Sequence, residues 1–379
     1  VCTHAEKRRN SILNTVTDKD DKKDIGGMRR RLAAWYAAHR RQLPWRDTND
    51  PYPIWVSEVM LQQTRVNTVL PYYERFLALF PSVDTLARSD IEMVLKAWEG
   101  LGYYARARNL HKAANIVSAL YNGKVPSAWE KFYQLPGVGE YIASAVLSIA
   151  FGHVHAVVDG NVKRVLARLF LVEDPVNSGG SHRAFKRRAT RLIDEAVPGL
   201  FNQAMMELGA LVCKPRNPAC HACCLHACCR AYQANRVDEY PKRLAGKPVP
   251  TYHIAAGVVR KNGKVLITRR KPEGLLGGLW EFPGGKVKKG EDARRACIRE
   301  IREETGVIAE IDKHLTRVKH AYTHFRIEMD VFCCRYLSGR VRLDGPEAFR
   351  WVRTQELPRY PFPKANLKFI PLLGGKAPE

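Results

Sequence analysis

A dense cluster of cysteines is the feature that most constrains how this chain can fold. Of the ten cysteines among its 379 residues, six lie between residues 213 and 229. Four of them follow the spacing C-x6-C-x2-C-x5-C: Cys213, Cys220, Cys223 and Cys229. This spacing is compact enough for one loop to bring four thiolates to a single metal centre. Tetrahedral zinc suits four cysteines equally well, and the extra Cys224 and Cys228 leave the choice of ligands open.

The surrounding sequence favours metal binding over a set of disulfide bonds. Residues 1–27 are polar and charged, without the apolar segment of a secretory signal, and we expect them to form a disordered leader. Clustered cysteines without such a signal are typical of a reducing compartment. No apolar run approaches the roughly 18 residues that cross a bilayer. We therefore expect an intracellular, cytoplasmic protein without a membrane segment.

The charge of the chain predicts a polyanionic partner. Lysine and arginine together number 62 against 38 aspartate and glutamate residues, which gives a formal net charge of +24. Such an excess is high for an ordinary enzyme and is typical of proteins that bind nucleic acid. Charge alone does not separate DNA from RNA, ribosomes or acidic lipid, and it also fits a generally basic protein.

The length and the pattern of apolar residues predict two domains of different class. From residue 28 onward, apolar residues recur at helical spacing between short Pro or Gly connections, which indicates an all-α domain over 28–230 that ends in the cysteine loop at 213–229. Residues 231–250 have no sustained period and read as a linker. Short β-rich runs around one helical segment near 292–304 then predict an α+β domain over 251–379.

The segment LPGVG predicts a tight turn between two helices. Ser127 and Glu130 have the spacing of a capping box that opens the first helix. Gly137 and Gly139 lack side chains, so their backbone N–H groups can approach a phosphate closely at the positive N-terminal end of the second helix. A simple helix connector would have the same sequence, so the turn alone is weak evidence of phosphate binding.

Two carboxylates have contrasting sequence environments. Glu58 has apolar helical neighbours, Ile54, Trp55 and Leu61, so we expect burial to raise its pKa and keep it protonated. Asp159 precedes an apolar helical period, and a helix N-terminus would favour its ionised form. Such pairs serve as acid and counter-charge in many active sites. The plainer alternatives are a helix cap for Asp159 and an exposed helical position for Glu58.

Several segments together resemble one family of DNA repair enzymes. LPWR, SEVMLQQT, WEGLGYYARARNL, LPGVGEY, VDGNVKRV and NQAMMELGALVC are similar to the mismatch adenine glycosylase (MutY) family across residues 40–230. LPGVG resembles the helix-hairpin-helix element of that superfamily, and the cysteine spacing matches its [4Fe-4S] loop. The resemblance implies a monofunctional DNA glycosylase that hydrolyses the N-glycosidic bond of adenine mispaired with 8-oxoguanine or guanine in double-stranded DNA. We expect it to act as a monomer.

The resemblance also implies residue roles. Glu58 would protonate N7 of adenine, and Asp159 would stabilise the sugar cation, with Tyr141 and Asn161 in support. Tyr141 stands where superfamily members that cut the backbone have a lysine nucleophile, so we expect no efficient lyase step. The pocket for the everted adenine would be lined by Trp45, Arg46 and Gln203, and the residues inserted into the duplex would be Gln63 and Tyr103.

The second domain carries a complete Nudix pattern, G-x5-E-x7-R-E-U-x-E-E-x-G-U, from Gly285 to Val307. Three of its carboxylates fall on one helical face, where they are candidate Mg²⁺ ligands: Glu300, Glu303 and Glu304. The alternative for this face is a solvated acidic surface.

The resemblance gives the second domain two functions that share one ligand. HAYTHF is similar to the loop by which these glycosylases recognise 8-oxoguanine, which puts Thr323 and His324 near the lesion. The tail resembles the 8-oxo-dGTP hydrolase (MutT) family, with Asn366 at the position that contacts the oxidised base. The alternatives to the glycosylase are therefore added 8-oxo-dGTP hydrolysis and a catalytically silent lesion-binding protein.

Overall fold

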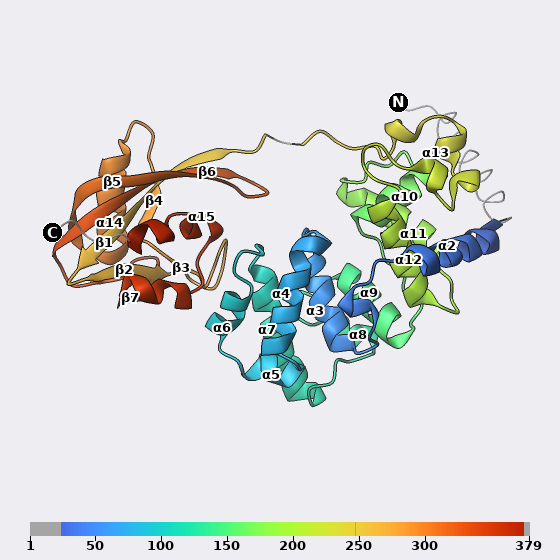
Figure 1. Cartoon of the computed structure of the whole chain (residues 1–379), viewed down its shortest axis with the longest axis horizontal. Coiled ribbons are helices and arrows are strands. Elements are labelled where there is room, and N and C mark those ends of the chain that lie inside the picture. Colours follow the sequence, from blue (N-terminus) through green and yellow to red (C-terminus); the bar gives the residue numbers. More distant parts are fainter. Residues whose placement is uncertain (1–23, 247, 375–379) are drawn as a thin grey trace, which may run out of the picture. The chain divides into compact units, whose positions relative to one another are not determined.

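A computed structural model describes residues 24–246 and 248–374 of the chain, which form two compact units (Figure 1). The first unit comprises residues 24–58 and 125–245, and the second comprises residues 59–124 with the described part of 246–374. The second unit therefore contains helices as well as strands. Among the described residues, no helix has the length and apolar character needed to span a bilayer.

The first unit is built from helices, as predicted. Its elements are α2 (Ile25–His39), η2 (Pro44–Arg46), α3 (Pro51–Leu61), which continues into the second unit, α8 (Trp129–Tyr133), α9 (Glu140–Phe151), α10 (Gly160–Phe170), η3 (Gly179–Ser181), α11 (His182–Leu192), α12 (Pro198–Leu211), η4 (Cys220–Ala222), η5 (His226–Cys228), α13 (Arg230–Gln233) and η6 (Val237–Glu239).

The expected leader over 1–27 is too long at its C-terminal end. Helix α2 already begins at Ile25, and Gly27 is buried within it. The leader was predicted from the polar composition of this segment, but the packing of α2 overrides both that composition and the weak helix propensity of the two glycines at 26 and 27. Residues 1–23 of the expected leader lie outside the described residues.

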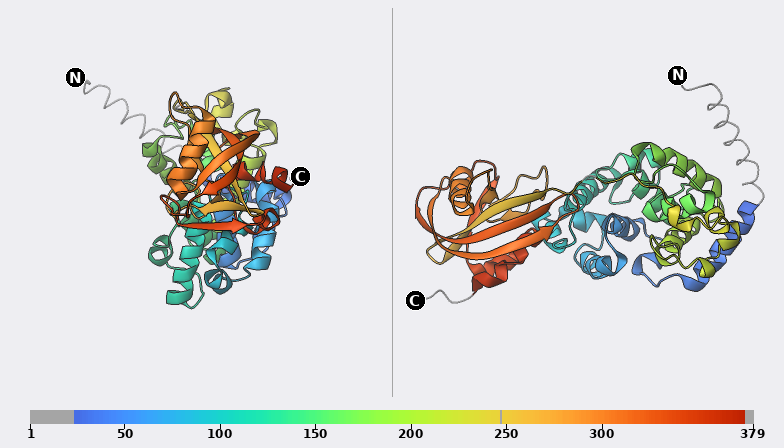
Figure 2. Two further views of the ribbon diagram at one scale, coloured as in Figure 1. Left: turned by 90° about the vertical axis from the view of Figure 1, so that its left-hand side faces the viewer. Right: turned by 90° about the horizontal axis from the view of Figure 1, so that it is seen from above.

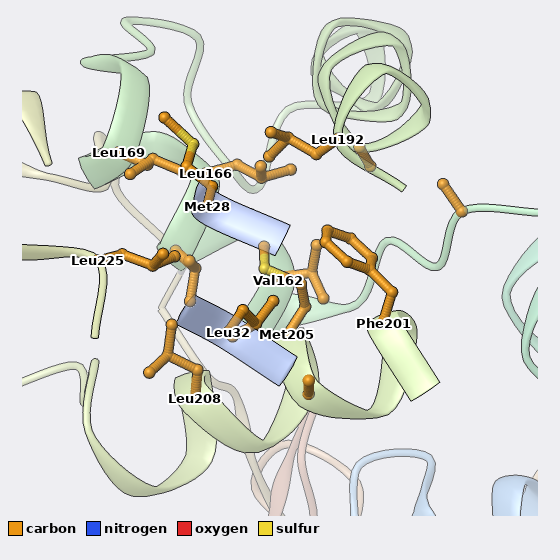
Figure 3. Packing of buried hydrophobic residues seen from close by; sticks show 14 of the residues in the cluster. Met28, Leu32, Val162, Leu166, Leu169, Leu192, Phe201, Met205, Leu208 and Leu225 are labelled. Atoms are coloured by element: carbon orange, nitrogen blue, oxygen red, sulfur yellow. The ribbon is translucent and has the colours of Figure 1, made fainter. Parts of the chain in front are cut away.

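The core of the first unit joins α2, α10 and α12 to the cysteine loop (Figure 3). Val162, Leu166 and Leu169 fall at helical spacing on α10 and are each at most 2% exposed. They pack in one cluster with Leu208 of α12 and with Leu225, which lies between the cysteines. This packing fixes the N-terminus of α10, where Asp159 lies, against the loop.

Among the described residues, the second unit combines six α-helices with a mixed sheet. Its elements are α4 (Val66–Leu79), α5 (Val83–Arg88), α6 (Ile91–Ala97), α7 (Ala105–Tyr121), β1 (Thr251–Lys261), β2 (Lys264–Arg269), β3 (Trp280–Glu281), β4 (Gly284–Lys286), α14 (Ala293–Thr305), β5 (Ile308–Ala321), β6 (Arg326–Ser338), β7 (Ala348–Val352), η7 (Thr354–Arg359), α15 (Lys364–Leu367) and η8 (Ile370–Gly374). The strand order is β3-β2-β1-β6-β5, with β4 paired to β1 and β7 to β2, and β1 runs parallel to β6.

Side-chain alternation along β1 explains how both faces of the sheet are covered. Ala255 and Val259 point toward α14, and Ala256 and Val258 point to the cluster that includes Phe362 beyond the other face. Accordingly, α14 and the C-terminal helices lie on opposite sides of the sheet (Figure 2). Helix α14 begins at Asp292, whose side chain caps its first turn, and ends at Gly306, so the predicted helix and the α+β class are confirmed.

Candidate active site

Glu58 is a buried acid held by a tyrosine. It lies on α3, is 4% exposed, and its Oε2 accepts a hydrogen bond of 2.5 Å from the Tyr141 hydroxyl. Burial raises the pKa of Glu58 to about 7, although the Tyr141 hydrogen bond acts in the opposite direction and favours the ionised form. The predicted burial and raised pKa are confirmed. At neutral pH the carboxyl can therefore either donate or accept a proton.

Asp159 is the N-cap of α10. Its Oδ1 accepts a hydrogen bond of 2.7 Å from the backbone N–H of Val162, and its Oδ2 accepts one of 3.0 Å from the Asn161 amide. Both hydrogen bonds favour the ionised form, as the sequence predicts, but burial raises the pKa of Asp159 above its ordinary value. The expected downward shift is therefore wrong, because a helix N-terminus is visible in the sequence while burial of the cap is not.

The two carboxylates share one electrostatic environment. The charge of Asp159 contributes to the raised pKa of Glu58, and both carboxylates, after burial, help to raise the pKa of Tyr141 well above its ordinary value. Tyr141 therefore remains a hydrogen-bond donor at every physiological pH. Glu58, the proton donor, and Asp159, the candidate anion, therefore interact electrostatically, as the predicted chemistry requires.

The hairpin turn leads directly to Tyr141. Gly137 has φ of +78°, which only glycine adopts without strain, and Gly139 is the N-cap of α9, of which Tyr141 is the second residue. The expected capping box is not formed: α8 is a single turn with Ala128 as its N-cap, and no side chain caps it. The helix begins after Ala128, one residue later than a capping box at Ser127 requires, so Lys131 and not Glu130 stands at its third position.

A buried arginine cluster lies in the same unit. Arg46 donates hydrogen bonds of 2.9 and 2.8 Å to the two oxygens of Glu207, and its guanidinium lies 5.4 Å from the centre of the Tyr36 ring. The Tyr36 hydroxyl in turn donates to Oε1 of Gln203 at 3.2 Å. Trp45, which precedes Arg46, is 6% exposed. Arg46 and Gln203, both proposed to line a pocket, are thus connected through one aromatic ring.

Glu207 is a residue that the sequence analysis missed. It is 1% exposed and also binds Arg41 through both of its oxygens, at 2.9 and 2.5 Å. Burial would raise the pKa of Glu207, but the hydrogen bonds from Arg41 and Arg46 outweigh burial and hold it at about 2. An acid four residues after Gln203, on an otherwise apolar stretch of α12, was the signal that could have identified it.

A chain of hydrogen bonds connects Asp159 to the cysteine loop. Asn161, which donates to Asp159, accepts a bond of 2.8 Å from Arg164, and the same guanidinium donates to the carbonyl oxygens of Cys213 at 2.7 Å and Gly209 at 2.8 Å. Two side chains, those of Asn161 and Arg164, therefore connect the candidate anion to the backbone of the first cysteine in the loop.

The four cysteines of the predicted spacing line one common cavity. Cys213, Cys220, Cys223 and Cys229 all line it. Cys224 and Cys228 do not line this cavity. Arg168 donates to Sγ of Cys213 at 3.4 Å, a contact that favours a thiolate. Within the described ranges, no three His, Cys, Asp or Glu side chains converge on a single metal ion. Four soft thiol donors around one cavity fit an iron-sulfur cluster.

The second unit contains the other predicted DNA contacts. Gln63 is exposed with φ of +58°, and Tyr103 has φ of +51°. The Tyr103 hydroxyl hydrogen-bonds to the hydroxyl of Thr323. A cavity of about 450 Å³ is lined by Tyr103, Thr323 and His324, together with other residues of 100–108, 274–276 and 320–325. Sequence positions 220 residues apart are thus brought together at one largely apolar hollow.

The three candidate Mg²⁺ ligands of the Nudix helix are hydrogen-bonded to neighbouring groups. Arg299 binds Glu300 at 2.7 Å and Glu303 at 2.8 Å, whereas Oε2 of Glu304 accepts a hydrogen bond of 3.1 Å from the backbone N–H of Gly284. Burial and the nearby Glu281 raise the pKa of Glu304 to about 8. Asn366, on α15, is 7% exposed.

Family models match both halves of the chain. Residues 56–191 match the model described as HhH-GPD superfamily base excision DNA repair protein, and residues 255–372 match the NUDIX domain model. Among solved structures, a thermostable thymine-DNA glycosylase superposes with a TM-score of 0.52 at 30% sequence identity, and the match covers 56% of this chain and 99% of that one.

Adenine DNA glycosylases are similar to the chain over most of its length. The protein of Mus musculus is 34% identical over 93% of this chain and 79% of its own length, and that of Homo sapiens is 33% identical over 94% and 76%. The chain therefore belongs to the adenine DNA glycosylase family, the enzymes of base excision repair that join a helical HhH-GPD domain to a Nudix-like domain.

Proposed function

We propose that the chain hydrolyses the N-glycosidic bond of adenine mispaired with 8-oxoguanine or guanine, and leaves the DNA backbone uncut. The observation that carries this proposal is the buried Glu58 with a pKa of about 7, bonded to Tyr141 and coupled electrostatically to Asp159. Tyr141 cannot form a Schiff base with the sugar, which supports base removal without an efficient lyase step.

Each group has a distinct task in this reaction. Glu58, protonated, donates its proton to N7 of adenine, so that the base leaves neutral. Asp159, ionised, stabilises the positive charge that develops on the sugar. Tyr141 orients the Glu58 carboxyl through its 2.5 Å hydrogen bond, and Asn161 holds Asp159. Trp45, Arg46 and Gln203 line the pocket for the everted adenine.

The DNA contacts are assigned to two further groups. The backbone N–H groups around Gly137 and Gly139 bind a phosphate, which the open space next to Gly139 supports. Gln63 and Tyr103 enter the duplex where adenine leaves the stack, and Thr323 and His324 contact the oxidised base. We propose that the protein acts on this DNA as a monomer, inside the cell.

The cysteine loop is assigned a [4Fe-4S] cluster. Cys213, Cys220, Cys223 and Cys229 would hold it, and when bound it supplies a covalent cross-link for a loop that has little secondary structure of its own. The bonds of Arg164 to Cys213 and Asn161 make the position of Asp159 depend on that loop.

We also propose the domain boundaries that the sequence suggests. Residues 28–230, together with the start of α2 at Ile25, form the glycosylase domain, and 251–379 form the Nudix-like domain, with 231–250 as the linker. The last helical segment of the first half, η6, ends at Glu239 within this linker, and the first strand begins at Thr251, which supports the change of class at this place.

One experiment tests the glycosylase. A labelled duplex with adenine opposite 8-oxoguanine is incubated with the wild type and with Glu58→Gln, and is then treated with alkali. We expect alkali-dependent cleavage with the wild type only, and full activity for the control Glu130→Gln, which alters an exposed glutamate on α8. Tight duplex binding by the wild type without an alkali-sensitive product would instead indicate a silent lesion-binding protein.

A second activity, hydrolysis of 8-oxo-dGTP, is favoured by the environment of Glu304. A half-buried carboxyl with a pKa of about 8 beside Glu281 is suited to take up a proton or a cation. Mg²⁺ would bind Glu300, Glu303 and Glu304, with Asn366 at the base. Mg²⁺-dependent release of pyrophosphate from 8-oxo-dGTP by the wild type, absent in Glu304→Gln, tests this; equal release by both would refute the assignment.

A further inference from the structure

Two turns of the second unit share an uncommon backbone conformation. Gln63 follows α3 with φ of +58°, and Tyr103 precedes α7 with φ of +51°. Gly100 and Gly102, next to Tyr103, also have positive φ, at +91° and +80°. Non-glycine residues adopt this conformation seldom, and it persists where neighbouring groups fix it. Both turns therefore require an anchor.

Arg106, the second residue of α7, is that anchor for both turns. Its two terminal nitrogens donate hydrogen bonds to oxygens on either side, at these distances: Val59 O 2.9 Å, Met60 O 2.7 Å, Gln62 O 2.7 Å, Thr64 Oγ1 3.2 Å and Gly102 O 3.0 Å. The first two carbonyls belong to the last turn of α3, which has no intrahelical donor for them. The oxygens of residues 62 and 102 each precede one of the strained residues, so one guanidinium holds the peptide next to Gln63 and the peptide next to Tyr103.

The surroundings of Arg106 make this arrangement rigid. Its guanidinium lies 5.4 Å from the centre of the Trp98 ring and 5.3 Å from that of Tyr103. Trp98 is fully buried, and its Nε1 donates to the same Gly102 oxygen at 3.1 Å. Burial lowers the pKa of Arg106 to about 10, and among the described residues no carboxylate contributes to this pKa. Backbone oxygens, the Thr64 hydroxyl and two aromatic faces compensate the charge, so the guanidinium has little freedom to move.

We propose that Arg106 is a positioning residue that fixes the Gln63 turn and the Tyr103 turn relative to each other, so that both side chains enter the DNA stack together when adenine is everted. This inference rests on the proposed function, because it takes the insertion of Gln63 and Tyr103 as given. Two side chains on separate turns can fill one gap only if the distance between the turns is preset. A planar guanidinium can bridge oxygens on both sides, whereas the ammonium of lysine cannot.

The test measures eversion separately from bond cleavage. 2-Aminopurine replaces adenine opposite 8-oxoguanine, and its fluorescence rises when it leaves the stack; the protein carries Glu58→Gln so that no base is removed. We expect Arg106→Lys to lower the equilibrium constant for eversion about tenfold, because charge-assisted hydrogen bonds on one side are lost. In protein with Glu58 intact, Arg106→Lys lowers the single-turnover rate but leaves the midpoint of its pH profile unchanged.

Controls separate this role from general stability. Arg75→Lys alters another arginine of the unit, which donates to Ala97 O at 3.1 Å and lies over the Tyr72 ring, and we expect it to evert the base as the wild type does. When Arg106→Lys is combined with Gln63→Ala and Tyr103→Ala, the equilibrium constant for eversion should fall by less than the product of the three separate fold-reductions, since all three residues act on one step.

The outcomes distinguish the inference from the function on which it rests. If the wild type removes no adenine, the proposed function fails, and the fluorescence still reports on Arg106. If the wild type removes adenine but Arg106→Lys everts 2-aminopurine normally, the inference is overturned. Should Arg106→Lys not fold, as judged by circular dichroism, Thr64→Val removes one of its acceptors instead. We expect that variant to reduce eversion by about twofold, and unchanged eversion would overturn the inference.

Discussion

Replacing Tyr141 by phenylalanine tests how the tyrosine hydroxyl changes the pKa of Glu58. The Tyr141 hydroxyl donates to the Glu58 carboxyl at 2.5 Å, and this bond lowers the pKa of Glu58, which burial would otherwise raise beyond about 7. Removing the donor must therefore move the pKa further up. A hydrogen bond to a charged group contributes about 1.5–3 kcal/mol, which corresponds to an upward shift of roughly one to two pH units.

The consequence appears on the alkaline side of the pH profile. Since protonated Glu58 is the proposed acid, the rate of base removal falls as pH rises through its pKa. At pH 8 about a tenth of the wild-type carboxyl would be protonated, whereas roughly half would be in Tyr141→Phe if the shift is about one unit. The plateau rate of the variant can also change, so the position of the midpoint is the decisive quantity.

Single-turnover removal of adenine from a duplex with 8-oxoguanine, measured across this pH range, gives the midpoint directly. Met206, whose Sδ lies 3.7 Å from the same hydroxyl, supplies a control: Met206→Leu removes a weak acceptor and should leave the midpoint unchanged. A Tyr141→Phe midpoint that stays in place, or moves to lower pH, would refute the argument that the hydroxyl stabilises ionised Glu58.

Three further predictions follow from the buried groups. The folded protein raises the pKa of Glu58 from 4.5 to about 7, so ionised Glu58 destabilises the fold at high pH. Glu58→Gln should therefore raise the free energy of unfolding, measured by urea denaturation, by about 3 kcal/mol at pH 8 and by little at pH 5. Glu207 has a lowered pKa, so the stability it contributes is present above pH 4.5 and is lost toward pH 2; Glu207→Gln should cost about 3–5 kcal/mol at pH 7 by the same method, and a change below 1 kcal/mol would contradict the reasoning. Arg164→Gln removes the hydrogen bonds that connect Cys213 to Asn161, and should lower both the iron content and the single-turnover rate. If both stay at the wild-type level, this connection has no functional role.

Local patterns in the sequence predicted the local structure well. The helix predicted near 292–304 is α14, which Asp292 caps, and Asp159, for which a helix cap was the plainer alternative, caps α10. The α14 helix ends at the Gly306 of its motif, where φ is +68°. These features depend on residues three or four positions apart, which a sequence displays directly. The predicted leader extends too far because packing, not local preference, decides where α2 begins, and the capping box at Ser127 is wrong because α8 begins one residue later, after Ala128.

The electrostatics of the site could be predicted only in part. Tyr141 and Glu58 are 83 positions apart, and Arg46 and Glu207 are 161 apart, so no spacing rule indicates that either pair is in contact. The direction of the Glu58 pKa shift could be predicted because its helical neighbours are apolar and bury it. For Asp159 the sequence displays the helix N-terminus, which lowers the pKa, but hides the burial that raises it.

One hairpin connects the proposed phosphate-binding turn to Glu58, the proposed acid. Gly137 and Gly139 shape the turn whose N–H groups would face a phosphate, and Tyr141, two residues later, bonds to the Glu58 carboxyl. Because α9 begins within this turn, a change in the turn must also move the tyrosine hydroxyl relative to Glu58. A side chain at Gly137 would strain the backbone, where φ is +78°, and so disturb phosphate binding and the pKa of Glu58 together. Gly139, with extended backbone and open space around it, allows the two effects to be separated, since a side chain there would obstruct the phosphate without moving Tyr141.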